Sequence, residues 1–285
     1  MKFYRLVHAA VPATALVIAI GLSAATAQTP PEATPKNIIL MIADGCGYNH
    51  IACADCYENG VCNSQHYEQT FTPLALSTYP ADGGYDPAEN WATFSAQKEK
   101  PTDSAAAGTA LSTGVKTYNG RIELGPDNAR LTGVEELAEK AGKATGVVTT
   151  VPLSHATPAC FIAHCEERGN YADIAHEMFA SNAEVIMGCG HPDYDNDGKL
   201  LPAIAPEDKD SKAAKKRYYW VGTPDFWSQV ITGQPLSPTV EGGPAVPWTF
   251  IESKEAFQDL AEGNNLPPRV LGVPRVHETL QADRS

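Results

Sequence analysis

Two polar segments in the first half of the chain carry residue types that bind metal ions or phosphate. Asp44 directly follows an apolar run, and Gly45 and Gly47 after it let the backbone come close to a ligand. Asp103 and Ser104 precede a run of small residues, which is the pattern of a helix start. A hydroxyl at that position lies beside free backbone amides and the positive end of the helix dipole, both of which favour a phosphate.

A third polar segment follows a second apolar run. His155 and Thr157 are two residues apart, so in an extended segment they point the same way and could reach one ion with an imidazole and a hydroxyl. Arg168 lies eleven residues beyond Thr157, and its planar guanidinium suits a phosphate group. Taken singly, these residues are more typical of turns, helix caps and surface charges, so the three segments must be weighed together.

The elements that would position these residues alternate between strands and helices. Such alternation predicts a mostly parallel sheet with helices on both faces, in which ligands bind at the ends of the strands. Apolar runs predict strands over 37–43, 146–151, 184–187 and 269–273, and helical periodicity predicts helices over 104–111, 134–141, 172–179 and 253–260. The fold class expected is a three-layer α/β/α sandwich.

The ends of the chain and one internal segment differ from this pattern. Residues 1–27 read as a cleavable signal peptide, because their apolar run is short of the roughly 20 residues of a membrane anchor. Residues 28–35 form a Pro-rich tether, and residues 36–285 form one α/β domain. Residues 188–247, rich in Pro, Gly and Asp, are expected to be an irregular excursion over the site. Periplasmic or secreted localisation follows, with no stable membrane anchor after cleavage.

The charge of the chain argues against nucleic acid as a partner. The net charge is −13, and removal of residues 1–27 leaves 19 basic against 34 acidic residues, which is −15. Such a surface repels a polyanion and favours solubility. The one basic cluster, over 212–217, follows an acidic stretch and is interpreted as a solvated face.

The seven cysteines permit disulfides if the chain is exported. Four of them crowd into the short segment between Cys46 and Cys62. No second Cys-x-x-Cys pair follows at zinc-ribbon spacing, so a local loop disulfide is favoured over a zinc or redox site. The connectivity stays open, and an odd total leaves at least one thiol free or paired between chains.

Together the three polar segments resemble the alkaline phosphatase family in order, spacing and residue types. Residues 36–47 look like its first strand with a metal-binding aspartate, and residues 102–120 (TDSAAAGTALSTGVKTYNG) look like its nucleophile helix. His155-Ala-Thr-Pro-Ala159 and Arg168 match its second metal segment and its phosphate-binding arginine. The resemblance covers most of residues 36–190 and returns weakly near 269–285.

The resemblance implies a Zn²⁺- and Mg²⁺-dependent hydrolase of small phosphate monoesters. Asp44 would bridge a zinc and a magnesium, and Ser104 would be both the nucleophile and a zinc ligand. Thr157 would bind the magnesium with His155 beside it, and Arg168 would hold two phosphate oxygens. Metal coordination would activate the weakly nucleophilic serine, which would form a phosphoserine intermediate. A homodimer stays open as the assembly.

The chain departs from the family in one large respect. The glutamate, aspartate and histidine ligands of the family's later half are not recognisable, and no Asp-His dipeptide occurs. Catalytic zinc needs three protein ligands, so Asp44 and Ser104 alone do not complete its site. We therefore expect a fragment or an interrupted reading frame that is inactive alone, or else a non-catalytic phosphate- or metal-binding remnant.

Three other readings of the motifs are weaker. A two-metal phosphodiesterase or sulfatase of the same superfamily would share the fold, but the TDSAAAGTA wording favours a monoesterase. A serine hydrolase of acyl substrates is disfavoured because Ser104 lacks the Gly-x-Ser-x-Gly elbow. Residues 193–198 (DYDNDG) open like a calcium loop, but Ile204 stands at the twelfth position, where an EF-hand needs a bidentate glutamate. A tight polar turn is favoured there.

Overall fold

The computed structural model describes residues 35–93, 95, 98, 101–234, 236 and 246–280. The chain divides into two units, residues 1–43 and residues 44–285. The expected signal peptide and, apart from Pro35, the expected tether lie outside the described residues.

The described part of the first unit, residues 35–43, has no regular secondary structure. The side chains of Ile38, Ile39 and Met41 are each more than four fifths exposed, at 83%, 85% and 88%. The strand predicted over 37–43 is therefore wrong for this structure. The physical reason is that a strand needs a hydrogen-bonded neighbour, and the described residues of this unit contain no second strand.

A parallel sheet lies at the centre of the second unit. Its strands are β1 (Gly146–Pro152), β2 (Val185–Cys189), β3 (Thr249–Ile251) and β4 (Val270–Gly272), in the order β1-β2-β4-β3. In the register, Ile186 lies opposite Val147 on one side and Leu271 on the other. The strands expected near 146–151, 184–187 and 269–273 are confirmed, whereas β3 was not predicted.

Among the described residues of the second unit, the helices that precede Ser104 are α1 (Tyr48–Asn59), α2 (His66–Thr70) and α3 (Pro87–Ala92). Those that follow are α5 (Ser104–Thr113), α6 (Val134–Lys140), α7 (Ala156–Ala159), α8 (Tyr171–Ala180), α9 (Lys212–Arg217), α10 (Pro224–Ile231) and α11 (Lys254–Ala261). Helices were expected at the places of α5, α6, α8 and α11. Among the described residues, no helix has the length and apolar character needed to cross a membrane.

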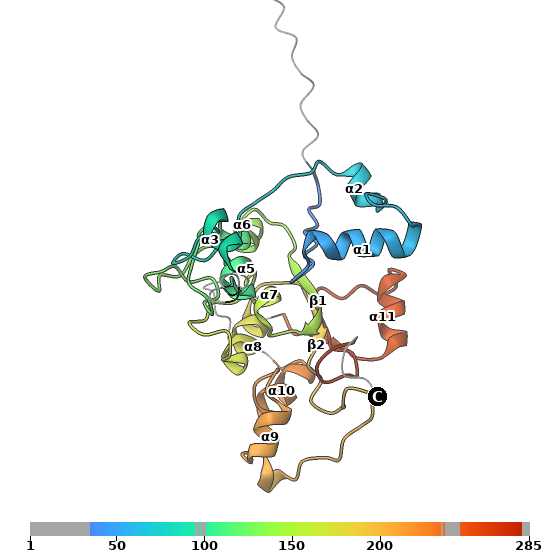
Figure 1. The fold of residues 1–285 in the computed structure, drawn as a ribbon. Helices are drawn as coiled ribbons and strands as arrows, with labels where there is room; N and C mark the ends of the chain where they lie inside the picture. The colour runs from blue at the N-terminus through green and yellow to red at the C-terminus, as the bar shows by residue number, and fades with distance from the viewer. Residues whose placement is uncertain are drawn as a thin grey trace, which may run out of the picture. The chain divides into compact units, whose positions relative to one another are not determined.

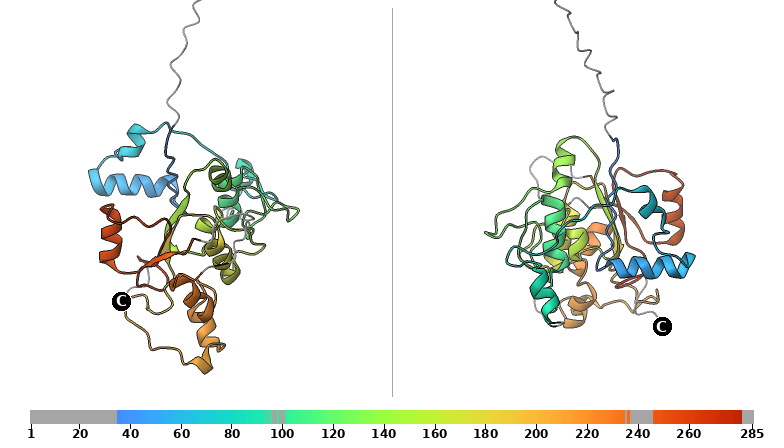
Figure 2. Two further views of the ribbon diagram at one scale, coloured as in Figure 1. Left: turned by 180° about the vertical axis from the view of Figure 1, so that it is seen from behind. Right: turned by 45° about the horizontal axis from the view of Figure 1, so that its top comes forward.

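Helices lie on both faces of the sheet (Figures 1 and 2). α5, α7 and α8 lie on one face and α11 on the other. Side chains of β2 alternate accordingly. Ile186 is fully buried in the main hydrophobic core. Met187 and Phe257 of α11 surround Gly272, where an added Cβ would lie 2.7 Å from the Phe257 ring. The chain therefore has an α/β fold, as expected from the alternating pattern.

The segment 188–247 is more regular than expected, because it contains α9 and α10. Each begins at a hydroxyl cap: Ser211 accepts from the N–H of Ala214, and Thr223 from that of Phe226. Trp227 of α10 is buried in the core. Caps of this kind are visible in the sequence. The prediction of an irregular segment gave more weight to the local abundance of Pro and Gly.

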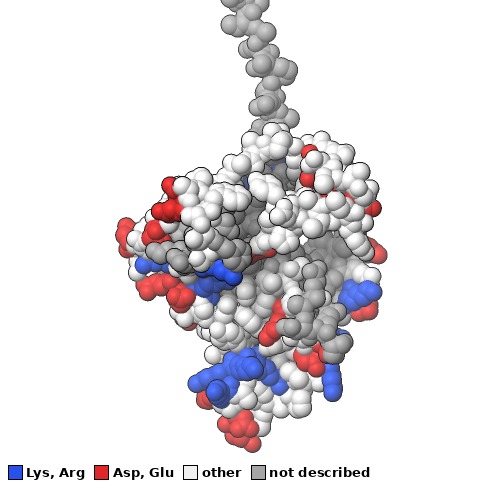
Figure 3. Space-filling model, viewed as in Figure 1, with Lys and Arg blue, Asp and Glu red and all other residues white. Residues whose placement is uncertain are grey.

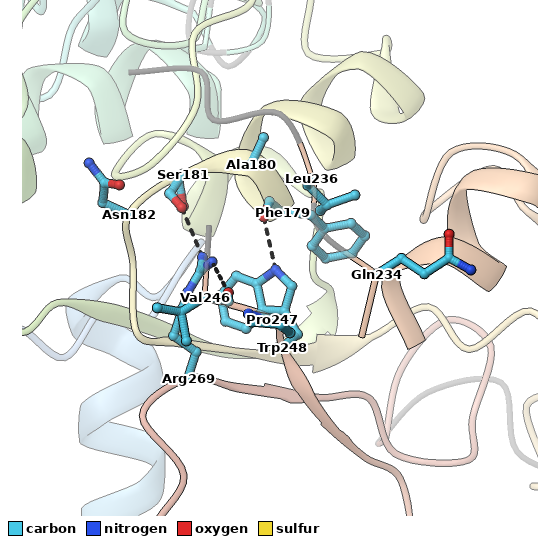
Figure 4. Close-up of a pocket in the computed structure, with 10 residues that line it drawn as sticks. All are labelled: Phe179, Ala180, Ser181, Asn182, Gln234, Leu236, Val246, Pro247, Trp248 and Arg269. Carbon is cyan, nitrogen blue, oxygen red and sulfur yellow. Dashed lines mark hydrogen bonds between the residues drawn. The ribbon is translucent and has the colours of Figure 1, made fainter. Parts of the chain in front are cut away.

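A partly buried arginine joins the sheet to the end of α8. The Arg269 guanidinium stacks on the Trp248 ring at 3.7 Å and donates to the carbonyls of Ser181, Ala183 and Val246 (Figure 4). The N–H groups of the Arg269 guanidinium therefore bind backbone carbonyls of three different residues and join these segments. The groove lined by these residues is structural and contains none of the predicted site residues.

The basic cluster over 212–217 gathers on α9 in Figure 3. Its last member, Arg217, forms an ion pair with Asp193 at 2.8 Å and donates to the carbonyls of Pro192 and Pro202. This arginine therefore fastens a loop of its own chain, while Lys215 and Lys216 are exposed, in keeping with the interpretation as a solvated face.

Candidate active site

Ser104 is the first residue of α5, and Asp103 caps that helix. The Asp103 Oδ1 atom accepts a hydrogen bond from the N–H of Ala106 at 2.8 Å. The Ser104 side chain is partly exposed, whereas Ala105 and Ala106 behind it are buried. The helix start predicted from the sequence is confirmed, and the hydroxyl lies at the end where backbone amides are free to meet an anion.

Asp103 also binds the predicted phosphate arginine. Its Oδ2 atom accepts from the Arg168 Nη1 atom at 3.2 Å and from the N–H of Gly120 at 2.9 Å. The N–H of Arg168 donates in turn to the Gly120 carbonyl at 2.7 Å, and Asn119 accepts from the N–H of Asp103. One carboxylate therefore both caps the helix that begins with Ser104 and binds Arg168, which lies 64 residues beyond Ser104 in the sequence. The sequence pattern indicated only a helix cap at Asp103 and did not indicate its contact with Arg168. The feature that could have indicated this role is an acidic residue directly before the expected nucleophile.

Asp44 and Thr157 are in direct contact. The Thr157 hydroxyl donates to the Asp44 Oδ2 atom at 2.6 Å, across 113 residues of sequence. Thr157 lies in α7, whose N-cap residue is His155, just beyond the end of β1. Two residues predicted to serve one metal position are thus brought together.

Close packing fixes α5 against α7. Cys160, at the end of α7, donates its thiol to the Ala105 carbonyl at 3.3 Å and lies 3.6 Å from the Thr109 hydroxyl. A Cβ atom added at Gly108 would lie 2.9 Å from Cys160, closer than such atoms approach. Glycine at this position therefore allows the two helices to approach, and the contact sets the place of Ser104 relative to Thr157.

His155 lies in an aromatic cluster beside these residues. Its ring is 5.6 Å from that of Tyr171 and 5.5 Å from that of Trp220. Burial lowers the pKa of His155, and the charge of Arg168 lowers it further, whereas Asp44 opposes the shift. The imidazole is therefore neutral at neutral pH, with a nitrogen lone pair available as a ligand or acceptor.

The oxygen pair of Asp44 and Thr157 suits Mg²⁺ better than zinc. A carboxylate and a hydroxyl are hard donors, and magnesium needs only one or two carboxylates beside water and substrate oxygens. In the part of the chain that the structure describes, no group of three or more His, Cys, Asp and Glu side chains lies close enough to hold a metal. The described residues therefore fit a magnesium position and do not fit a three-ligand zinc site.

The calcium-like segment 193–198 forms a turn. Asp195 accepts from the N–H groups of Asp197 and Lys199 at 3.0 and 2.8 Å, and Gly198 adopts φ +77°. Asp193 is used by Arg217. These contacts agree with the interpretation as a tight polar turn.

The chain is similar to known proteins over much of its length. Residues 35–196 match the family model for alkaline phosphatase. The chain is 36% identical over 177 residues to alkaline phosphatase 4 of Bacillus subtilis, covering 58% of this chain and 35% of that protein. It is 36% identical over 190 residues to the alkaline phosphatase of Escherichia coli, covering 59% of this chain and 38% of that protein.

A solved structure extends the similarity to the fold. A cold-active alkaline phosphatase from Shewanella matches with a TM-score of 0.54 and 27% identity, over 84% of this chain and 46% of that one. The chain thus spans less than half the length of these relatives.

Proposed function

The chain belongs to the alkaline phosphatase family, and from this membership we propose that, with a complete metal site, it hydrolyses phosphate monoesters through a phosphoserine on Ser104. The observation that carries the proposal is the shared carboxylate of Asp103, which caps the helix that begins with Ser104 and holds Arg168 beside it. A nucleophile and a bidentate anion ligand are thereby held within one contact network.

The proposed reaction has two displacements at phosphorus. In the first, the Ser104 hydroxyl gives up its proton to solvent and its oxygen forms a bond to phosphorus while the ester bond breaks, and the leaving alkoxide takes up a proton from solvent. In the second, water attacks the phosphoserine, which releases inorganic phosphate and restores the hydroxyl. Arg168 and the amides at the start of α5 stabilise the charge on the phosphoryl oxygens in both steps.

We propose that Asp44 and Thr157 would hold Mg²⁺, with His155 beside them. The ion would supply positive charge that lowers the barrier at the phosphoryl group. Asp44 and Ser104 stay predicted zinc ligands from the family resemblance, but the described residues do not complete a zinc site. The 285 residues by themselves are therefore proposed to be inactive.

The incomplete ligand set favours a second candidate, in which the chain binds phosphate or a metal without turnover. The same oxygen pair and arginine serve binding as well as catalysis, so only an activity measurement separates the two. We propose that the substrates are small phosphate monoesters, and that the protein is exported to the periplasm or medium. For an exported protein, sequencing of its N-terminus should begin at Gln28.

The test is a trapping experiment with a matched variant. The protein from its own host and the 285-residue chain are each incubated with a phosphorus-labelled aryl phosphate and quenched in acid. We expect label on Ser104 in the host protein, none in Ser104→Ala, and full labelling in Ser112→Ala, which alters another serine of the same helix. Active protein without label on Ser104 would sink the covalent mechanism. Absence of turnover from the host protein, with phosphate still bound, would favour the binding candidate.

A further inference from the structure

The segment after α1 folds back along the last turn of that helix. The helix ends at Gly60, which adopts the left-handed conformation with φ +72° and donates its N–H to the Cys56 carbonyl at 3.1 Å. Glycine adopts this conformation without steric cost and is the usual residue for such a helix end. The chain therefore reverses direction within a few residues of Cys56.

A buried aspartate fastens the returning segment to the helix. Asp55 is only 1% exposed, and its carboxylate accepts from the N–H of Asn63 at 2.7 Å and from the N–H and hydroxyl of Ser64 at 3.3 and 3.0 Å. A buried carboxylate that loses such partners is costly, so these three hydrogen bonds define the path of the loop.

This arrangement places two thiols in contact. Cys56 follows Asp55 on the helix and Cys62 precedes Asn63 in the loop, and their Sγ atoms are 3.8 Å apart. Both residues are exposed and therefore accessible to an oxidant. A disulfide needs a sulfur–sulfur distance of about 2.0 Å, which requires only local adjustment of two exposed side chains.

We propose that Cys56 and Cys62 are oxidised to a disulfide in the exported protein. The two thiols lose two protons and two electrons, one sulfur–sulfur bond forms, and the electrons reduce a disulfide-bearing oxidant to two thiols. The bridge closes the loop 56–62 and holds the returning segment on α1 together with Asp55.

The other cysteines are less suited to this pairing. Cys53 and Cys56 lie three residues apart on one helix, where Cβ atoms are about 5–6 Å apart, whereas a disulfide needs about 3.5–4.5 Å. Bridging them would require the helix to unwind. Cys160 and Cys189 are buried, so an oxidant does not reach them while the chain is folded.

The electrostatics favour a stable bridge over a reactive redox centre. The hydrogen bond to Cys62 and the repulsion between the two sulfurs raise the pKa of Cys56. Reactive Cys-x-x-Cys thiols have a lowered pKa instead. We therefore propose that the disulfide between Cys56 and Cys62 forms once in an oxidising environment and then persists.

Peptide mapping tests the pairing on the whole 285-residue chain, whether or not it is an enzyme. The folded protein is equilibrated with oxidised and reduced glutathione, its free thiols are alkylated, and it is cleaved after glutamate and before aspartate without reduction. Cleavage after Glu58 and Glu68 puts Cys56 and Cys62 on separate peptides, and cleavage before Asp55 separates Cys53 from Cys56. We expect one cross-linked pair joining Cys56 and Cys62, two hydrogens lighter than the reduced peptides.

Three variants make the result specific. Cys56→Ser and Cys62→Ser should each abolish the cross-link and leave the remaining partner alkylated. Cys53→Ser, one helical turn away, should retain the cross-link in full. Linkage of Cys53 in place of either partner, or alkylation of both Cys56 and Cys62 in oxidised and folded wild-type protein, would overturn the proposal.

Discussion

Asp103 is the residue on which the geometry of the candidate site depends most. One oxygen of its carboxylate caps α5, and the other binds both the Gly120 amide and the Arg168 guanidinium. Because the Arg168 side chain is only 25% exposed, its orientation is set by this partner rather than by water. A substitution of Asp103 should therefore change the affinity for phosphate by altering the orientation of Arg168.

The first prediction concerns phosphate affinity. Arg168→Lys loses the planar fork that binds two oxygens, and Asp103→Asn keeps the helix cap but loses the charge that orients Arg168. We expect each change to weaken binding of inorganic phosphate by roughly tenfold, which is about 1.4 kcal/mol. Arg130→Lys, at an exposed ion pair, is the control and should bind normally. Equal phosphate affinity in Arg168→Lys and Arg130→Lys, measured by phosphorus NMR titration, would rule out Arg168 as the ligand.

The second prediction concerns stability and pH. Burial raises the pKa of Glu123 from 4.5 to about 7, against the opposing effects of Ser112 and His164. Between these pH values the folded state binds more protons than the unfolded state, so stability falls as pH rises, by at most about 3 kcal/mol. Glu123→Gln, neutral throughout, should flatten this slope in denaturant titrations from pH 4.5 to 7.5. Exposed Glu166→Gln should leave it unchanged; an unchanged slope in Glu123→Gln would contradict the assignment.

At the scale of elements, α5 and α7 act as one rigid pair. The contact between Gly108 and Cys160 holds the helix that begins with Ser104 against the short helix that carries Thr157. Small residues at such a contact permit backbones to approach, and the packed interior leaves little room for adjustment. Substitutions at this contact should therefore change stability and the relative placement of the two ligand-bearing ends together.

The third prediction tests that contact. In Gly108→Ala the new methyl group would lie 2.9 Å from the Cβ and Sγ atoms of Cys160. We expect a net loss of about 1–2 kcal/mol, because overpacking outweighs the better helix propensity of alanine. Adding Cys160→Ala removes the sulfur and should recover part of that loss, measured as non-additivity in a double-mutant cycle. Strict additivity of the two changes would mean that the helices do not meet there.

At the scale of the whole molecule, some apolar side chains of the sheet are buried in the core and others are exposed to solvent. On edge strand β1, Val147 is 9% exposed and joins the core, whereas its neighbour Val148 is 72% exposed. An apolar side chain exposed on an edge strand favours self-association. The net charge of −13 opposes that tendency without covering this position.

The fourth prediction uses these two neighbours as a matched pair. Val148→Lys places a charge in solvent and should reduce aggregation of the 285-residue chain while leaving its free energy of unfolding within about 0.5 kcal/mol of wild type. Val147→Lys buries an unpaired charge and should destabilise the fold by several kcal/mol. Light scattering and denaturant titration measure the two effects. Comparable destabilisation by both changes would show that the strand has a different orientation.

Local patterns were sufficient to predict three of the four described strands and four of the ten described α-helices. The apolar runs at β1 and β2 and the cap before Ser104 are visible in the sequence because strand burial and helix capping depend on residues close together in the chain. The family resemblance rests on the same property, since the nucleophile segment keeps its residues in one continuous run. α10 was missed although Thr223 and Pro224 form a helix start, because the surrounding prolines and glycines hid it.

Contacts between distant residues were decided only by the tertiary structure. The Thr157 to Asp44 hydrogen bond spans 113 residues and the Arg168 to Asp103 pair spans 65, and no local pattern specifies which carboxylate each group meets. Cys56 and Cys62 are only six residues apart, and for them the sequence favoured a local bridge without giving the partners; their contact depends on the hydrogen bonds of Asp55. The sequence by itself determined the kinds of chemical group present and the elements that carry them. Their pairing came from packing, because long-range contacts form only when the buried faces of several elements meet at once.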